Sequence, residues 1–224
     1  MSQYLIASQG HTPDLKSKNS YSNLFKTLVL ALILTINASS SFAVIPFLFK
    51  TSDPHTNPFN GKNLTGWGYL EKQSEKMVFI AIDGRKESSD SRFTGKKGIL
   101  SVNPWNLAKG PHWISLWTVQ EYPEDFSLSL EFRASVNADS GIYLRGKQLQ
   151  CRDYLVAGPY KKLQKYKAQD WNKIEVTVTN NVARCTCNGE VLEEALQLPP
   201  TGRFGLEADR GLMEYRNIKI KSLK

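Results

Sequence analysis

The stretch "FSLSLEFRA", residues 126–134, alternates apolar and polar side chains along its whole length. Successive side chains of a strand point to opposite faces, so this pattern predicts a strand with one buried and one solvent-facing side. The same alternation recurs in "KIEVTVT" (173–179) and in "SGIYLRG" (140–146). We therefore predict that the apolar positions of these three segments fill a core: Phe126, Leu128, Leu130, Phe132, Ile142, Leu144, Ile174, Val176 and Val178.

Turn signals separate further strands. Asn180-Asn181 precedes "VARCTC", and Asn188-Gly189 precedes "EVLEE". An Asn-Gly pair between alternating runs is a strong hairpin signal. The segments "GRFGLEA" (202–208) and "EYRNIKIKSL" (214–223) add two more predicted strands, and no helical periodicity is found. Many short antiparallel strands predict an all-β sandwich or jelly roll.

The N-terminal segment has a different composition from the rest of the chain. A leader with several lysines precedes the apolar run Thr27 to Ile36, and "NASSSFA" follows it, with Ser41 and Ala43 at the small-residue positions of a cleavage site. This is typical of a secretory signal peptide, so we expect residues 1–43 to be removed and the protein to be secreted or periplasmic. The alternative is an uncleaved anchor, through which alone the protein would contact a membrane. We predict a linker over residues 44–57 and one domain over 58–224.

Charge, cysteines and histidines narrow the function classes. The formal net charge is +8, but no basic run or basic helix accompanies it, which argues against a nucleic-acid partner. Cys151, Cys185 and Cys187 are interpreted as small core residues, with one bridge from Cys151 left open. The three histidines have no ligand spacing, so no cofactor is predicted and a requirement for a divalent metal stays open.

A candidate site follows from the polar positions of the strands. In "ADSGIYLRG" (138–146), Tyr143 and Arg145 alternate with the apolar residues, and the same parity selects Glu131, Arg133, Gln150, Arg152 and Glu207, with Asp153 in a neighbouring turn. One interpretation is a solvated face with cross-strand ion pairs. The other is a polar platform that holds a sugar through directed hydrogen bonds and aromatic stacking. Trp105 and Trp113 are candidates for a loop at the rim of the pocket.

Several motifs in order carry a resemblance to a known family: "PFNGKNLTGW" (58–67), "GILSV" (98–102), "LWTVQEYPEDFSLSLEFRASVNADSGIYLRG" (116–146), "WNKIEVTVTNNVARCTCNGEVL" (171–192) and "GRFGLEADRGLMEYRNIKIKSL" (202–223). Their order and spacing resemble the bacterial 3-keto-disaccharide hydrolase family, also described as 3-keto-glycoside 1,2-lyase and 3-keto-2-hydroxy-glucal hydratase. The resemblance implies a concanavalin-like jelly-roll β-sandwich of antiparallel strands.

The resemblance also implies chemistry on an oligosaccharide or other glycoside already oxidised at carbon 3. The ketone acidifies the proton on carbon 2, a base removes it, and the substituent on carbon 1 leaves by β-elimination. Water can then add to the resulting glucal. Such a site needs a base, donors to the enolate oxygen and an acid for the leaving group. Glu131, Asp153 or Glu207 are the candidate base or acid, and Arg133, Arg145, Gln150 and Arg152 the candidate donors.

Two positions depart from the family pattern. The strand after "YLRG" typically runs Glu-x-Gln-x-x-Asp, and here Gln148 replaces the Glu; in the last motif Glu207 stands where the family often has Gln. An amide cannot act as a base, so either another carboxylate acts or the protein binds sugar without turnover. Three functions therefore remain: an exported 3-keto-glycoside hydrolase or lyase, a non-catalytic carbohydrate-binding module of the cell envelope, and a structural envelope domain.

Overall fold

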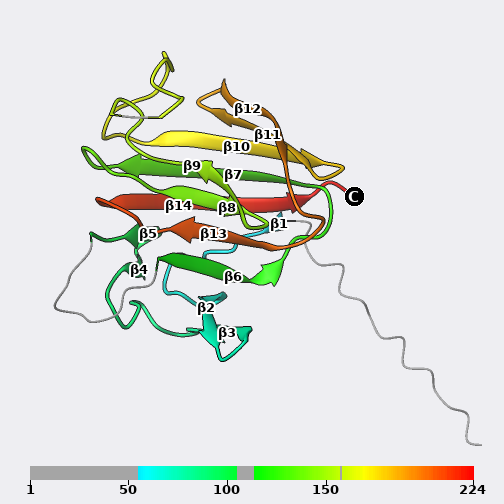
Figure 1. Ribbon diagram of the computed structural model, residues 1–224. Coiled ribbons are helices and arrows are strands. Elements are labelled where there is room, and N and C mark those ends of the chain that lie inside the picture. The colour runs from blue at the N-terminus through cyan, green and yellow to red at the C-terminus, as the bar shows by residue number, and fades with distance from the viewer. Residues whose placement is uncertain (1–54, 105–113, 157) are drawn as a thin grey trace, which may run out of the picture. The chain divides into compact units, whose positions relative to one another are not determined.

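The computed structural model describes residues 55–104, 114–156 and 158–224. Within these residues the chain forms two antiparallel sheets that pack as a sandwich (Figure 1). The all-β jelly-roll prediction is therefore confirmed. None of the described segments forms a helix long and apolar enough to cross a membrane.

Sheet A contains the strands that the alternating pattern predicted best. Its order is β12 (Glu190–Gln197), β11 (Val182–Cys187), β10 (Asn172–Thr179), β7 (Phe126–Ala134), β14 (Met213–Ser222), β5 (Ile99–Val102) and β4 (Phe93–Lys96), and β1 (His55–Thr56) also pairs with β14. Residues 55–56 belong to the predicted linker, and they add a short strand to this sheet before Pro58, where the domain was predicted to begin. A strand of two residues is too short to show a period in the sequence.

Sheet B carries the candidate site. Its order is β3 (Lys76–Ala81), β2 (Trp67–Gln73), β6 (Ser115–Glu121), β13 (Arg203–Glu207), β8 (Gly141–Leu144) and β9 (Lys147–Gln150). Strands β6 and β13, and also β13 and β8, are distant in sequence and are paired antiparallel. Residues that are far apart in the chain therefore meet on one sheet face.

The core lies between the two sheets. All nine apolar residues predicted from the three alternating segments are buried there, each with at most 4% of its surface exposed. The three cysteines are free and buried in the same core, which confirms their interpretation as small core residues; no bridge from Cys151 forms. Burial raises the pKa of the Cys185 and Cys187 thiols to about 12, so both stay protonated.

Positive φ angles identify the hairpin turns. Asn180 and Asn181 join β10 to β11, and Asn188 and Gly189 join β11 to β12, all with φ between 49° and 82° as the sequence predicted. The turn from β8 to β9 is Arg145-Gly146, with φ of 51° and 83°. Two left-handed residues in succession form the turn that suits the twist of a two-residue hairpin. Arg145 is therefore a turn residue and does not continue the alternation of the strand before it.

Candidate active site

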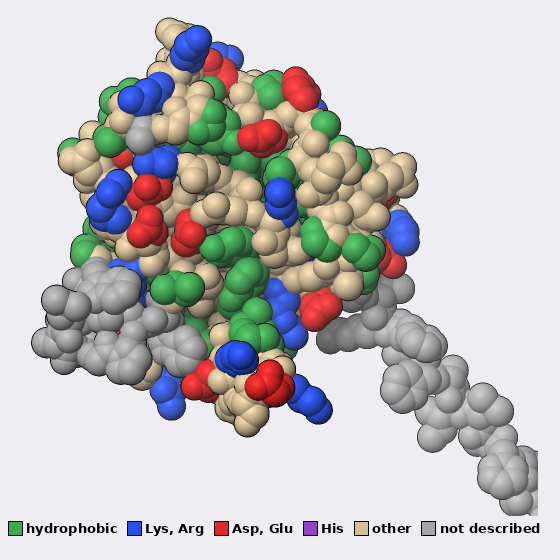
Figure 2. Space-filling model, in the orientation of Figure 1, with side chains coloured by type: hydrophobic (Ala, Val, Ile, Leu, Met, Phe, Trp, Pro, Cys, Tyr) green, Lys and Arg blue, Asp and Glu red, His purple; other side chains and the backbone are tan. Residues whose placement is uncertain are grey.

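The outward face of sheet B presents two neighbouring rows of side chains. Strand pairing aligns β6, β13, β8 and β9 across the sheet. One row contains Trp117, Gly205, Tyr143 and Gln148, and the next contains Ser115, Glu207, Gly141 and Gln150. Figure 2 shows hydrophobic side chains gathered in the middle of this face, with acidic side chains beside them. The face thus combines aromatic surface with hydrogen-bonding groups, as sugar sites do.

Two glycines leave room for the larger side chains of these rows. A Cβ atom added to Gly205 would lie 2.6 Å from the Trp117 ring, and one added to Gly141 would lie 2.9 Å from Gln148 and 3.1 Å from Glu207. Over Gly205 the rings of Trp117 and Tyr143 stack, with centroids 4.8 Å apart and planes inclined by 26°. Any larger residue at either glycine would displace the groups that form the site.

Glu207 is the carboxylate at the centre of the face. Its Oε1 accepts a hydrogen bond of 3.0 Å from the Tyr143 hydroxyl, and its Oε2 accepts one of 2.5 Å from Gln148 Nε2. Burial raises the pKa of the Glu207 carboxyl above its ordinary value, and the hydrogen bonds from Tyr143 and Gln148 oppose that shift. The negative charges of Asp209 and Asp139 raise the pKa further. A carboxylate with a raised pKa is a stronger base than an ordinary glutamate.

Tyr143 keeps its proton next to Glu207. Burial raises the pKa of the Tyr143 phenol, and the adjacent Glu207 carboxylate raises it further. The phenol therefore donates to Glu207 and does not compete with it as a base. Its ring, stacked on Trp117, is also fixed in orientation by this bond.

Arg152 and Gln150 form the polar edge of the site next to β9. Arg152 NH1 donates to Gln150 Oε1 over 2.8 Å, and its NH2 pairs with Asp139 Oδ2 over 2.9 Å. Arg210 lies 3.6 Å from the same Asp139 oxygen. Because Arg152 is buried, its role here is to orient Gln150. The oxygen of the Gln150 amide faces the arginine, which leaves the amide NH2 group to donate to a ligand.

Glu131 and Arg133 do not lie near Glu207, so the prediction that they share a sheet face with Tyr143 is wrong. Both are on the outer face of sheet A, on the opposite side of the sandwich. Glu131 pairs with Arg216 and Arg133 with Glu214, at 2.5 and 2.6 Å. Both guanidiniums also lie over the Trp171 ring. Alternation along a strand separates inside from outside, but it does not say to which sheet the strand belongs.

Arg145 is also misplaced by the prediction. Its guanidinium is buried and donates to the carbonyl oxygens of Tyr122, Glu124 and Pro199 and to Asn181 Oδ1, over 2.5 to 3.1 Å. The positive φ of the turn directs this side chain away from the face that carries Tyr143. The Arg145 guanidinium therefore fixes the connection between β6 and β7.

Asp153 is a structural residue as well. It is 2% exposed and accepts hydrogen bonds from the Asn137 backbone N–H, from Gln169 Nε2 and from the Tyr166 hydroxyl. Its carboxylate thus organises the long connection after β9. Of the predicted residues, the structure brings together Tyr143, Gln150, Arg152 and Glu207. Trp105 and Trp113 lie outside the described residues.

The sequence analysis missed Trp117 as a site residue. Trp117 lies between the buried residues Leu116 and Thr118 of β6, so the alternation along this strand makes its side chain face outward. Gln148 was noted only as a departure from the family pattern, yet it is in direct contact with Glu207. Contact between β9 and β13 across β8 depends on the absence of a side chain at Gly141, which no local pattern indicates.

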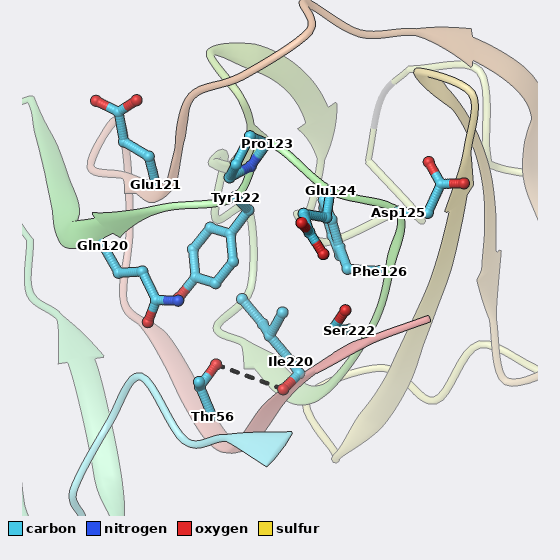
Figure 3. A pocket seen from close by; sticks show the side chains of 10 residues that line it. All are labelled: Thr56, Gln120, Glu121, Tyr122, Pro123, Glu124, Asp125, Phe126, Ile220 and Ser222. Atoms are coloured by element: carbon cyan, nitrogen blue, oxygen red, sulfur yellow. Dashed lines mark hydrogen bonds between the residues drawn. The ribbon is translucent and has the colours of Figure 1, made fainter. Parts of the chain in front are cut away.

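Other features of the described residues are weaker candidates. No group of three or more His, Cys, Asp or Glu side chains there is arranged to hold a metal ion. A pocket of about 200 Å³ lies between the β6–β7 connection and the end of β14 (Figure 3). Its walls include the Tyr122 ring and Ile220, while the carboxylates of Glu121 and Asp125 point away from that ring.

The fold and this site define a β-sandwich protein with a carboxylate and an aromatic platform on one sheet face. The sequence of residues 54–221 matches the family described as the 3-keto-alpha-glucoside-1,2-lyase-like domain. Because this match covers most of the chain, the protein belongs to that family.

Several solved structures are similar to this chain. The chain is similar to a putative glycosyl hydrolase from Parabacteroides distasonis ATCC 8503, with a TM-score of 0.53, 16% identity, and coverage of 76% of this chain and 94% of that one. A second such protein from the same organism gives a TM-score of 0.48 at 20% identity, over 61% and 93% of the two chains. The β-glucanase of Bacillus licheniformis gives a TM-score of 0.44 at 12% identity, over 76% of this chain and 97% of that one. A search of curated protein sequences gave no match.

The buried guanidinium of Arg145 is predicted to stabilise the fold. Replacing Arg145 with Ala leaves three backbone carbonyls and the Asn181 side chain without their charged donor, so we expect the free energy of unfolding to fall by about 2–4 kcal/mol. Denaturant melts of the purified domain measure this change. Arg145→Lys is the matched control and should recover only part of the loss, because an ammonium cannot reproduce the fork of a guanidinium. An unchanged midpoint for Arg145→Ala would contradict the assignment.

Proposed function

We propose that this protein is an exported lyase or hydrolase that acts on 3-keto-glucosides, with Glu207 as the base. The observation that carries the proposal is the Glu207 carboxylate itself, half-buried, raised in pKa and open on the outward face of sheet B beside a stacked aromatic pair. Membership of a family of 3-keto-glucoside lyase-like domains supports the substrate class.

The proposed reaction uses the groups in a defined order. The sugar ring lies against the Trp117 and Tyr143 rings, and Glu207 removes the proton on carbon 2, which the carbon-3 ketone has acidified. Negative charge then develops on the ketone oxygen, where the NH2 group of Gln150 donates. A donor aimed at developing charge typically contributes about a hundredfold or more to the rate. The substituent on carbon 1 leaves with the electrons of its bond, and water then adds to the glucal.

The pair formed by Gln148 and Glu207 bears on the two departures from the family pattern. Where that pattern has Glu and Gln, this chain has Gln and Glu, and the two side chains are hydrogen-bonded at 2.5 Å. The site therefore still contains one carboxylate in contact with one amide. The carboxylate is on β13 and the amide on β9, which is the reverse of the family pattern. This arrangement supports an enzyme more than a module that has lost its base.

Exchange of the two side chains tests the proposed base. Glu207→Gln should lower turnover of a 3-keto-glucoside about a hundredfold or more, since a positioned base contributes that much. The double variant Gln148→Glu/Glu207→Gln returns a carboxylate to the same place. Its turnover should be at least about tenfold higher than that of Glu207→Gln. Release of the sugar and absorbance of the glucal give the rate.

Glu131→Gln is the control for this test. It removes a carboxylate that lies on the opposite sheet and should leave turnover unchanged. Full activity in Glu207→Gln would exclude Glu207 as the base.

The raised pKa predicts a pH dependence. Glu207 acts only when it is deprotonated, so kcat/KM should rise with pH through a midpoint above the ordinary value of 4.5. Asp209 favours the protonated form of Glu207, so Asp209→Asn should move this midpoint to lower pH. The pH profiles of the two proteins measure the difference, with Glu175→Gln as a control on the far sheet. A midpoint at 4.5 in the wild type would contradict the assignment.

The stacked rings favour one alternative, a carbohydrate-binding module without catalysis. Trp117 and Tyr143 offer a platform for a sugar ring whether or not Glu207 abstracts a proton. Under this alternative a 3-keto-glucoside binds to the wild type but no glucal or free sugar is released, and the Glu207→Gln substitution changes affinity without changing a rate.

Export is the part of the proposal that rests on the N-terminal segment. The apolar run before Ser41-Phe42-Ala43 supports cleavage after Ala43 and release of the mature protein from the membrane. Mass spectrometry of the secreted or periplasmic protein should give an N-terminus at Val44. A protein found in the membrane fraction with an N-terminus near Met1 would show an anchor instead.

A further inference from the structure

A groove adjoins the site beyond the row that contains Trp117 and Tyr143. It has a volume of about 410 Å³. Its apolar walls come from the β2–β3 hairpin and from β6 (Leu70, Met77, Phe79 and Trp117), and the remaining lining residues are Glu121, Arg145, Gly146, Gly202 and Arg203. Trp117 belongs to both places, because one part of its ring stacks on Tyr143 and it also lines the groove. The groove is therefore continuous with the place where the sugar ring is proposed to lie.

The charged residues of the groove already have ion-pair or hydrogen-bond partners within the protein. Arg203 pairs with Glu121 at 3.5 Å, donates to the Thr118 carbonyl at 2.9 Å, and lies over the Phe79 ring at 4.3 Å. The other carboxylate oxygen of Glu121 accepts from the Thr201 hydroxyl at 3.2 Å. Arg145, which also lines the groove, is held by backbone carbonyls. The groove thus offers apolar walls and few directed partners for hydroxyl groups.

The position of the base orients the substrate with respect to this groove. Carbon 2 must face Glu207, and carbons 1 and 3 lie on either side of it. Gln150, the donor for the carbon-3 oxygen, is in the row of Glu207, whereas the groove begins at Trp117 in the next row and extends from there to Met77 and Phe79 of β3. With the ketone at Gln150, the substituent on carbon 1 extends past Trp117 into the groove.

We propose that this groove is the leaving-group subsite and that it selects an apolar or aromatic aglycone over a second sugar. This inference rests on the proposed function. In the reaction the carbon-2 proton passes to Glu207, the bond between carbon 1 and the glycosidic oxygen breaks, and the aglycone leaves as an alcohol or phenol after taking up a proton from water. Phe79, Met77 and Trp117 contact the aglycone, and hydroxyls of a second sugar would lose water there without gaining partners.

Met77 and Phe79 are specificity residues in this proposal. Met77 is 60% exposed, although it lies on a strand, and its thioether is a flexible apolar group that adapts to a ring. Phe79 is held flat by Arg203 on one side and by the close approach of Gly68, where an added Cβ atom would lie 2.6 Å from the ring. A fixed ring face next to a flexible side chain is suited to an aryl group.

The test compares phenyl and methyl 3-keto-glucosides in the wild type and in Phe79→Ala and Met77→Ser. The ratio of kcat/KM for phenyl over methyl should fall about tenfold in Phe79→Ala, and in the same direction in Met77→Ser. The two leaving groups differ in intrinsic reactivity, but this difference is the same for every variant. A change in the ratio between variants therefore reports the effect of the substitution alone. Val78→Ala is the matched control, since Val78 is the intervening residue of β3 and does not line the groove.

The outcomes separate this inference from the proposed function. Equal losses for both substrates in Phe79→Ala, or a 3-keto-disaccharide that outperforms the phenyl compound in the wild type, would overturn the subsite while leaving the lyase intact. If the wild type converts neither substrate, the proposed reaction fails, and calorimetric binding of the same two compounds decides the subsite. Tighter binding of the phenyl compound that is lost in Phe79→Ala supports it, and equal binding of both compounds overturns it.

Discussion

Packing of apolar side chains between the two sheets is the constraint on which the rest of this structure depends. Once Leu130, Ile142 and Val176 are buried between the layers, every neighbouring polar residue of their strands must face outward. The outer face of sheet A neutralises its charges through ion pairs such as Glu131 with Arg216. On the outer face of sheet B, the Glu207 carboxylate is instead held by neutral donors. That difference gives the two faces different chemistry.

The environment of Glu207 shows how a sheet can raise the pKa of an ordinary carboxylate. A salt bridge would lower its pKa and weaken it as a base, whereas burial among neutral partners raises the pKa. Tyr143 and Gln148 still fix both carboxylate oxygens in place. Gly141 and Gly205 make these contacts possible because they bring side chains from next-nearest strands together. The Glu207 carboxylate is thus held in place by two hydrogen bonds, and no ion pair among the described residues neutralises its charge.

The polar edge at Gln150 and the ring of Phe79 lie on strands on opposite sides of Glu207, the proposed base. In the proposed reaction, the substrate would meet a hydrogen-bond donor on one side and ring faces on the other. The proposed chemistry and the proposed preference for an apolar leaving group follow from one arrangement of strands, β9-β8-β13-β6-β2-β3. Selectivity and catalysis would then be separable by mutation, since Phe79 is on β3 and Glu207 is on β13, with β2 and β6 between them.

The sequence alone determined the all-β class, the inward residues of β7, β8 and β10, and the Asn-containing hairpin turns, because each depends on neighbours along the chain. It also selected Glu207, Tyr143, Gln150 and Arg152. It could not separate these from Glu131 and Arg133, because parity is a property of one strand and the assignment of strands to sheets is not. Arg145 was misplaced because two residues of positive φ end the alternation at that turn. The contact of Gln148 with Glu207, and the groove beside Trp117, were decided only by the pairing of distant strands.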